Sequence, residues 1–262
     1  SGKPATATLL PAAPNTGIWF KRTDVDLGDR MIPARWDAVN RSPLCTKLEN
    51  KSGLQVSTVE HLMAALAGCG IHNVLVEIDG PEVPILDGSA APFVRGIMAR
   101  GVQMQSAPVM AIEVLKEVTV QDGDAVATIA PSDTLRIDFE IDFVDAAIGH
   151  QQKSLVMNNG SFARELCDSR TFCRQADVDA MQANGLAPVR HKMLDALGDL
   201  ALAGAPLLGH YTGIRAGHSL TNTLLRALFA TPGAVRMVQC DSEMAARLPG
   251  HGLVWNEIPA VA

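Results

Sequence analysis

The stretch that organises the chain reads Arg190-His191-Lys192-Met193-Leu194-Asp195-Ala196-Leu197-Gly198-Asp199. A helix turns about 100° per residue, which places Leu194 and Leu197 on one side. His191, Asp195 and Asp199 follow one another on the opposite side at i, i+4 and i+8. A His and an Asp four residues apart on a helix can share one ion. A bare H-x-x-x-D also occurs on amphipathic helices with a solvated polar face, so the rest of the chain has to decide between the two interpretations.

Composition places the chain among ordinary globular proteins. It has 262 residues, of which 47% are hydrophobic and 19% charged, enough for one large domain or two modest ones. A net charge of -6 argues against a nucleic-acid binder, whose surface would be basic. No apolar run approaches the roughly 18 residues of a membrane-spanning helix, and we see no signal peptide.

The cysteines indicate a reducing compartment. The chain has five of them, scattered and without a C-x-x-C pair. This pattern favours free thiols over a disulfide framework or a cysteine zinc site. We therefore expect a cytoplasmic protein in which any metal is held by histidines and carboxylates.

The order of predicted elements divides the chain into two α+β domains, residues 1–105 and 106–262. In the first, a helix at 57–68 is predicted with Ser57 as its N-cap and Glu60 at the N3 position of a capping box. A hairpin at 44–56, a strand at 73–78 and a helix at 91–100 are also predicted. In the second, the predicted elements are strands at 112–120, 125–130, 135–143 and 207–212 and helices at 178–184, 191–203 and 220–230. The stretch 162–173 is predicted to be helical at first and then irregular.

The two halves share a rhythm of strands, then a helix with an early histidine, then a strand. His61-Leu62-Met63 loosely echoes His191-Lys192-Met193. If the helices of two α+β halves pack together, His61 and His191 approach one cleft.

A metal hydrolase needs three protein ligands and an open fourth position. His61, His191 and Asp195 form a set that suits a borderline ion such as Zn²⁺. Glu60, beside a ligand but not bound, could then take a proton from the attacking water. The alternative is that Glu60 only caps its helix and that His61 is a partly buried helix residue.

His218 is a second candidate for proton transfer. It stands just before Ser219, which is predicted to cap the helix at 220–230, so the helix N-terminus would lower its pKa. Asp199 could oppose that effect and keep an imidazolium available for an oxyanion or a leaving amine. The remaining histidines are assigned surface or hydrogen-bonded roles, with His150 and His251 in polar loops.

Several blocks are similar to the UDP-3-O-acyl-N-acetylglucosamine deacetylase family, zinc enzymes that commit Gram-negative bacteria to lipid A synthesis. The resemblance covers nearly the whole chain in one order. The blocks are Ser57-Thr58-Val59-Glu60-His61-Leu62, Glu82-Val83-Pro84-Ile85-Leu86-Asp87-Gly88-Ser89-Ala90-Ala91-Pro92-Phe93, Ser169-Arg170-Thr171-Phe172, Arg190-His191-Lys192-Met193-Leu194-Asp195-Ala196-Leu197-Gly198-Asp199-Leu200 and Gly217-His218-Ser219-Leu220.

The resemblance implies a role for each matching position. The zinc ligands would be His61, His191 and Asp195, with Glu60 as the general base. His218, oriented by Asp199, would be the electrostatic stabiliser or acid, and the Thr171 hydroxyl would hydrogen-bond the developing oxyanion. Substrate contacts would come from Phe172 against the glucosamine, Lys192 and Arg215 near the diphosphate, and Asp142 and Phe143 at the uracil.

The resemblance also implies a fold, a two-domain β-α-α-β sandwich with the helices layered between two sheets. Two departures from the family pattern stand out. A family strand and histidine before Ser1 are absent, and so is an insert of a loop, strand and helix between Ala187 and Pro188. That insert would help to wall the acyl-chain passage, so its absence bears on chain-length selectivity and not on the metal site.

The favoured function is zinc-dependent removal of acetate from UDP-3-O-acyl-N-acetylglucosamine, with Fe²⁺ as the alternative metal. A non-catalytic nucleotide-sugar-binding relative is a second possibility. The sequence of such a relative would lack Glu60 or one of the ligands, and none of these residues is lost here. A zinc amidase with another substrate is a third possibility. Lys192, Arg215 and Phe172 are weak evidence against it, because they match the family's substrate contacts. We expect a monomer that binds the UDP-linked acylated glucosamine, with no nucleic-acid partner.

Overall fold

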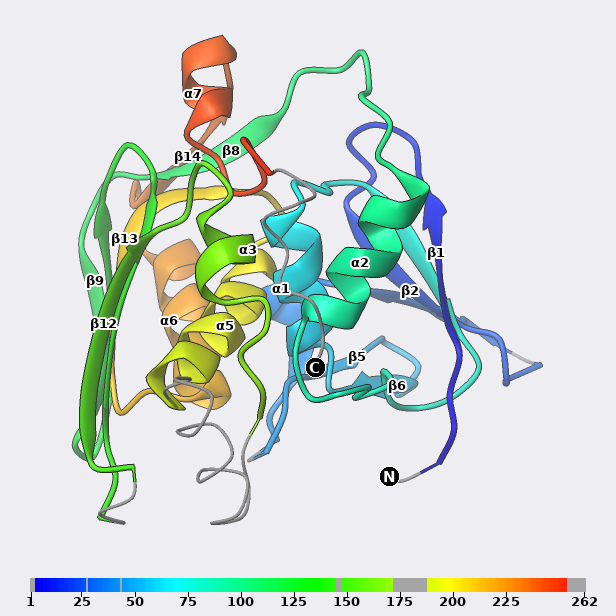
Figure 1. Cartoon of the computed structure of the whole chain (residues 1–262), viewed down its shortest axis with the longest axis horizontal. Coiled ribbons are helices and arrows are strands. Elements are labelled where there is room, and N and C mark those ends of the chain that lie inside the picture. Colours follow the sequence, from blue (N-terminus) through cyan, green and yellow to red (C-terminus); the bar gives the residue numbers. More distant parts are fainter. Residues whose placement is uncertain (1–2, 27, 43, 145–147, 172–187, 254–262) are drawn as a thin grey trace.

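Strands and helices alternate along the chain in a mixed α/β arrangement. The structure is a computed structural model that describes residues 3–26, 28–42, 44–144, 148–171 and 188–253. In these ranges the strands form three sheets. Helices lie between the two larger sheets in Figure 1, which draws α1, α5 and α6 in the middle.

The first sheet belongs to the N-terminal half and has the order β1-β7-β2-β3. Its strands are β1 (Ala7–Pro11), β2 (Ile18–Arg22), β3 (Met31–Pro33) and β7 (Val74–Ile78). Val74, Val76 and Ile78 alternate toward the core, as expected of a strand with one buried face. A short helix η1 (Trp36–Ala38) leads to a small sheet of β4 (Val39–Asn40), β5 (Lys47–Glu49) and β6 (Gln55–Ser57).

The second sheet belongs to the C-terminal half and has the order β12-β11-β13-β10-β9, with β8 beside β13 and β14 beside β8. Its strands are β8 (Met110–Val114), β9 (Val118–Asp122), β10 (Ala125–Pro131), β11 (Leu135–Asp142), β12 (His150–Val156), β13 (Leu207–Ile214) and β14 (Val235–Gln239). The sheet runs down the left side of Figure 1.

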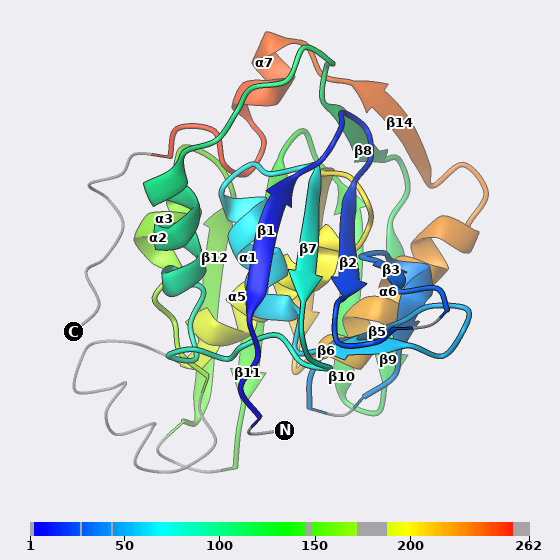
Figure 2. The ribbon, with the colours of Figure 1, turned by 90° about the vertical axis from the view of Figure 1, so that its right-hand side faces the viewer.

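The helices pack against these sheets. They are α1 (Glu60–Gly68), α2 (Ala91–Arg100), α3 (Ser161–Glu165), α5 (Pro188–Ala201), α6 (His218–Ala230) and α7 (Ser242–Ala246). In Figure 2 the strands β1, β7 and β2 stand in front of α1 and α5. Pro92 in its first turn and Gly101 just after its end fit the observed bounds of α2, which match the prediction.

The predicted internal repeat is confirmed by the strand order. β7 runs antiparallel to β1 and parallel to β2, while β13 runs antiparallel to β10 and parallel to β11. Each of these central strands follows a histidine-bearing helix, α1 before β7 and α5 before β13. The helices α1 and α5 therefore occupy equivalent positions in the two halves, and they pack against each other.

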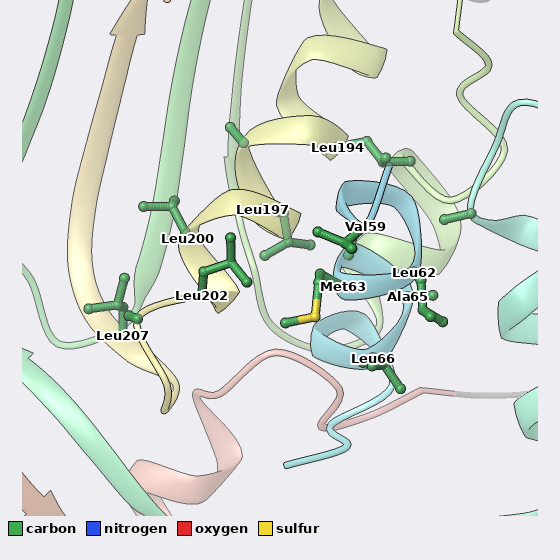
Figure 3. Close-up of a cluster of buried hydrophobic side chains, with 14 of the residues drawn as sticks. Val59, Leu62, Met63, Ala65, Leu66, Leu194, Leu197, Leu200, Leu202 and Leu207 are labelled. Atoms are coloured by element: carbon green, nitrogen blue, oxygen red, sulfur yellow. The ribbon is translucent and has the colours of Figure 1, made fainter. Parts of the chain in front are cut away.

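Apolar side chains hold α1 against α5. Figure 3 shows Val59 and Met63 next to Leu197 of α5, and all three side chains are buried. The two helices approach closely at Gly198, where an added Cβ would lie 2.0 Å from the carbonyl oxygen of Glu60. Only glycine allows the two helix backbones to meet there.

We expect Gly198→Ala to destabilise the fold by about 1–3 kcal/mol, the usual cost of overpacking a core. The atoms that the new methyl group would meet all belong to the backbone of Glu60, so α1 has to shift as a whole. Urea unfolding measures the effect. Gly96→Ala in α2 is the matched control, because a Cβ there meets nothing within 4 Å. Equal unfolding midpoints for the two variants would show that the crossing tolerates a methyl group.

Several predicted details are wrong. The capping box fails because α1 begins at Glu60 and Val59 is its N-cap, while Ser57 ends β6 and its hydroxyl donates to the carbonyl of Pro81. Ser219 does not cap α6, which already begins at His218 after Gly217. The strand predicted at 112–120 is two strands, β8 and β9. His150 opens strand β12 and does not lie in a loop. The helix predicted at 178–184 lies outside the described residues.

Candidate active site

The first turn of α1 and the middle of α5 supply the central side chains of the site. Glu60 and His61 come from α1, and His191, Asp195 and Asp199 come from α5. Their exposed fractions are only 3–4%. The polar face of α5 is therefore buried, which excludes the solvated amphipathic helix that its spacing also allowed.

A strained turn directs Glu60 into the site. Thr58, between β6 and α1, has a φ of 59°, in the left-handed region that β-branched residues avoid. Such a conformation costs about 1–3 kcal/mol. The Thr58 hydroxyl donates to Glu82 Oε1 at 2.9 Å, which helps to hold the turn. The chain thus leaves β6 abruptly and enters α1 with Glu60 as its first residue.

His61, His191 and Asp195 form a buried group whose geometry fits a tetrahedral metal ion. The Nε2 atoms of His61 and His191 lie 3.5 and 3.3 Å from Asp195 Oδ1. Ligand atoms at about 2.0–2.1 Å from a tetrahedral ion are about 3.3–3.4 Å apart. Both distances to Asp195 are therefore close to the spacing that an ion requires, and all three ligand atoms lie within 4.8 Å of one another.

The hydrogen bonds around the trio also fit a metal ion. Within the described part of the chain, the buried Oδ1 of Asp195 has no hydrogen-bond partner. His191 Nδ1 lies 3.2 Å from the carbonyl oxygen of Ser169, so this nitrogen is the one that carries the proton. In this tautomer the Nε2 atom of His191, which faces Asp195, carries a lone pair and no proton. Metal-ligating histidines have the same arrangement.

The charges of the ligands suit a cation. Burial lowers the pKa of His191 to about 4, so the imidazole is neutral and able to ligate. Burial alone would raise the pKa of Asp195, but His191 and the Lys192 ammonium hold it well below its usual range. Lys192 Nζ lies 2.8 Å from Asp195 Oδ2. Asp195 thus has one oxygen tied to Lys192 and the other facing the two imidazoles.

Glu60 has the properties of a general base. Burial, together with the neighbouring carboxylates of Asp195 and Asp199, raises its pKa to about 7, against an opposing effect of His218. A base whose pKa lies near the working pH transfers protons efficiently. Its Oε2 accepts a hydrogen bond from the backbone N–H of Thr46 at 3.0 Å, which leaves Oε1 facing His218.

His218 and Asp199 meet, as predicted. His218 Nδ1 donates to Asp199 Oδ2 at 2.8 Å. Burial would lower the pKa of His218, but the charge and hydrogen bond of Asp199 raise it to about 10. The other ring nitrogen, Nε2, lies 4.0 Å from Glu60 Oε1 and 3.8 Å from Asp195 Oδ2. A charged imidazolium therefore lies close to both Glu60 and Asp195.

The predicted substrate residues have contacts in separate parts of the structure. Thr171 is exposed, two residues after Ser169, and its N–H donates to the carbonyl of Gly88 at 2.8 Å. Arg215 forms an ion pair with Asp142, so two predicted substrate contacts are adjacent. Phe143 follows and is 41% exposed. Phe172 lies outside the described residues.

Sequence reasoning missed Thr46, which is buried and touches both Glu60 and Asp199. Nothing in its local pattern marks it, because its partners are 14 and 153 positions away. Thr46 and His218 line a small cleft together with Asn40, Cys45 and Asn222. Only the spatial arrangement shows that this threonine belongs to the site.

None of the helices in the described ranges is long and apolar enough to cross a membrane.

Comparison with known proteins identifies the family. The sequence model of the UDP-3-O-acyl N-acetylglycosamine deacetylases matches residues 1–188 and 187–230. The two matched stretches meet at residues 187–188, where the resemblance implied a missing insert. The deacetylase of Phenylobacterium zucineum is 43% identical over 94% of this chain and 93% of its own length. That of Anaeromyxobacter sp. is 41% identical over 95% and 90%, and that of Shewanella frigidimarina 38% identical over 93% and 89%. The chain therefore belongs to the UDP-3-O-acyl N-acetylglycosamine deacetylase family.

Proposed function

We propose that the chain is a zinc-dependent deacetylase that hydrolyses the 2-acetamido group of UDP-3-O-acyl-N-acetylglucosamine and releases acetate, the committed step of lipid A biosynthesis. Membership of the family supports the reaction. The observation that carries the proposal for this chain is the buried group of His61, His191 and Asp195 with Glu60 and His218 beside it.

Zinc is the proposed metal because two imidazoles and one carboxylate form a ligand set of borderline softness, with Fe²⁺ as the alternative. When bound, the ion supplies Lewis acidity that acidifies water and polarises the amide carbonyl. His61, His191 and Asp195 would hold the ion with three protein ligands, the number that catalytic zinc sites use.

The chain's own residues then move the protons. Glu60 takes a proton from the attacking water at Oε1, the oxygen that faces His218. The imidazolium of His218 stabilises the negative charge that develops on the amide oxygen, and its Nε2 proton can pass to the leaving amine. Asp199 accepts a hydrogen bond from Nδ1, and its negative charge stabilises the imidazolium, so that Nε2 also keeps its proton. The Thr171 hydroxyl is proposed to donate to the same developing oxyanion.

Substrate binding is proposed at the residues that match the family's substrate contacts. Arg215 and Lys192 would attract the diphosphate, Phe172 would lie against the glucosamine, and Asp142 with Phe143 would receive the uracil. Arg215 is paired with Asp142 and with Asp124, the latter at 3.4 Å. A diphosphate at Arg215 would therefore have to compete with these carboxylates.

We further propose that residues 1–105 and 106–262 are the two domains of a sandwich that encloses the helices. A cytoplasmic monomer without a nucleic-acid partner fits the composition. A nucleotide-sugar-binding relative without activity is disfavoured, because Glu60 and all three ligands are in place. A zinc amidase with another substrate would share the centre and differ at the residues that match the family's substrate contacts.

One experiment tests the reaction and the substrate together. Purified protein is analysed for metal and assayed for acetate release from UDP-3-O-acyl-N-acetylglucosamine and from UDP-N-acetylglucosamine without the acyl chain. We expect about one Zn²⁺ per chain and faster turnover of the acylated substrate. Acetate release from simple amides but from neither UDP-sugar would favour the other zinc amidase.

The pH profile tests the pair of His218 and Asp199. His218 acts while protonated, so activity falls as the pH rises through its pKa. Asp199 raises that pKa. Asp199→Asn removes the charge and is therefore expected to move the basic limb of the kcat profile to lower pH, with zinc content near that of the wild type. An unchanged basic limb would show that another group sets it.

A further inference from the structure

Thr46 occupies an unusual place in the site. It lies directly before β5, at the end of the segment 41–46, and is 4% exposed. Each of its polar groups reaches a different partner. Its N–H donates to Glu60 Oε2 at 3.0 Å, its hydroxyl donates to Asp199 Oδ1 at 2.5 Å, and its carbonyl accepts from the N–H of Val59 at 3.3 Å.

The direction of the hydroxyl bond is fixed by chemistry. A carboxylate can only accept, so the Thr46 hydroxyl has to be the donor. Asp199 then receives one donor on each oxygen, Thr46 on Oδ1 and His218 on Oδ2. Both rotation of the carboxylate and its distance from α6 are restricted by these two bonds. Burial makes them stronger, because water does not compete.

Two proton-handling groups are thus attached to one residue. The backbone of Thr46 holds the start of α1 and the carboxylate of Glu60, while its side chain holds Asp199 and, through Asp199, the ring of His218. We propose that Thr46 is a positioning residue of the deacetylase, which sets the spacing between the Glu60 carboxylate and the His218 imidazole. This inference rests on the proposed function.

The hydroxyl can be removed without changing the shape of the side chain. Thr46→Val keeps the backbone bonds and the volume but leaves Asp199 Oδ1 without its donor. Thr46→Ser restores the donor. We expect Thr46→Val to lower kcat by about 10- to 100-fold, since small misplacements of reacting groups have effects of this size. KM and metal content should stay near wild type, and Thr46→Ser should recover kcat to within about threefold.

A control and a double variant separate positioning from stability. Thr134→Val removes a hydroxyl that donates to the carbonyl of Arg247 at 2.9 Å, in the turn between β10 and β11. We expect it to affect melting but not kcat. Because Thr46 is proposed to act through Asp199, adding Thr46→Val to Asp199→Asn should lower kcat far less than Thr46→Val does alone.

A readout that needs no metal completes the test. In the metal-free protein, the Nδ1 proton of His218 in its bond to Asp199 should give a downfield proton NMR signal. We expect this signal in wild type and Thr46→Ser, and its broadening or loss in Thr46→Val. If Thr46→Val does not fold, Thr46→Cys, which is a much weaker donor, replaces it with the same expectations.

Several outcomes would overturn the proposal. The first is a wild-type kcat in Thr46→Val, and the second is an equal loss of kcat in Thr46→Val and Thr46→Ser. The third is a double variant in which the effects of Thr46→Val and Asp199→Asn on kcat are fully additive. A wild type that binds metal but releases no acetate from the UDP-sugar would instead refute the proposed function, and the NMR signal would still test the contact.

Discussion

Asp195→Ala and His61→Ala are expected to lose the metal ion and at least about 10³-fold in kcat/KM, because Lewis-acid stabilisation contributes several kcal/mol. Asp195 contributes the oxygen that faces both imidazoles, at 3.3 and 3.5 Å. Two ligands are left in either variant, fewer than a stable zinc site requires. Metal analysis after dialysis, together with acetate release, measures both effects.

His150→Ala is the matched control for the histidine variant. His150 is a half-exposed side chain of β12 that pairs with Glu140 at 3.1 Å on the sheet, and it should keep both metal and rate. A chelator provides a second check, because an ion that binds only the folded protein stabilises it by mass action. Chelation should lower the melting temperature of wild type and leave that of Asp195→Ala unchanged. Full metal content in Asp195→Ala would show that the ligand group is wrong.

Glu60→Gln is expected to keep the metal and to lose about 10²–10⁴-fold in kcat, the usual effect of removing a general base. Glutamine preserves an oxygen that can accept the Thr46 N–H, so the first turn of α1 should stay in place. It cannot take a proton from water. Steady-state kinetics with metal analysis of the same sample separates this loss from that of a ligand variant.

The alternative for Glu60 was a capping role, and the structure already speaks against it. Glu60 is the first residue of α1, its carboxylate accepts from Thr46, and α1 has no side-chain cap. A Glu60→Gln protein that melts a little lower but turns over at the wild-type rate would nevertheless remove Glu60 from the mechanism.

The helices of the site could be predicted from the sequence because their apolar spacing is regular. The i, i+4, i+8 series of α5 correctly placed His191, Asp195 and Asp199 on one side. The repeated rhythm of the halves also predicted that His61 would approach His191, and their ring centroids are 5.0 Å apart. Both inferences rest on local pattern combined with a packing rule.

The details that failed depend on tertiary contacts. Glu60 resembles a capping residue because of its spacing from Ser57, but the positive φ of Thr58 starts the helix later. β12, with the sequence HQQKSLV, is mostly polar because it is the edge strand beside β11, so it lacked the alternation of a buried strand. The role of Thr46 could not be predicted from the sequence, because its hydrogen-bond partners Glu60 and Asp199 are remote along the chain.

The division of the ligands between the two halves determines when during folding the ion can enter. His61 and His191 are 130 positions apart and meet only after α1 has docked on α5. Before docking, the first half offers a single imidazole and the second only His191 with Asp195. Neither half holds a complete site by itself. All three residues can therefore hold one ion only in a chain whose two halves have already packed together.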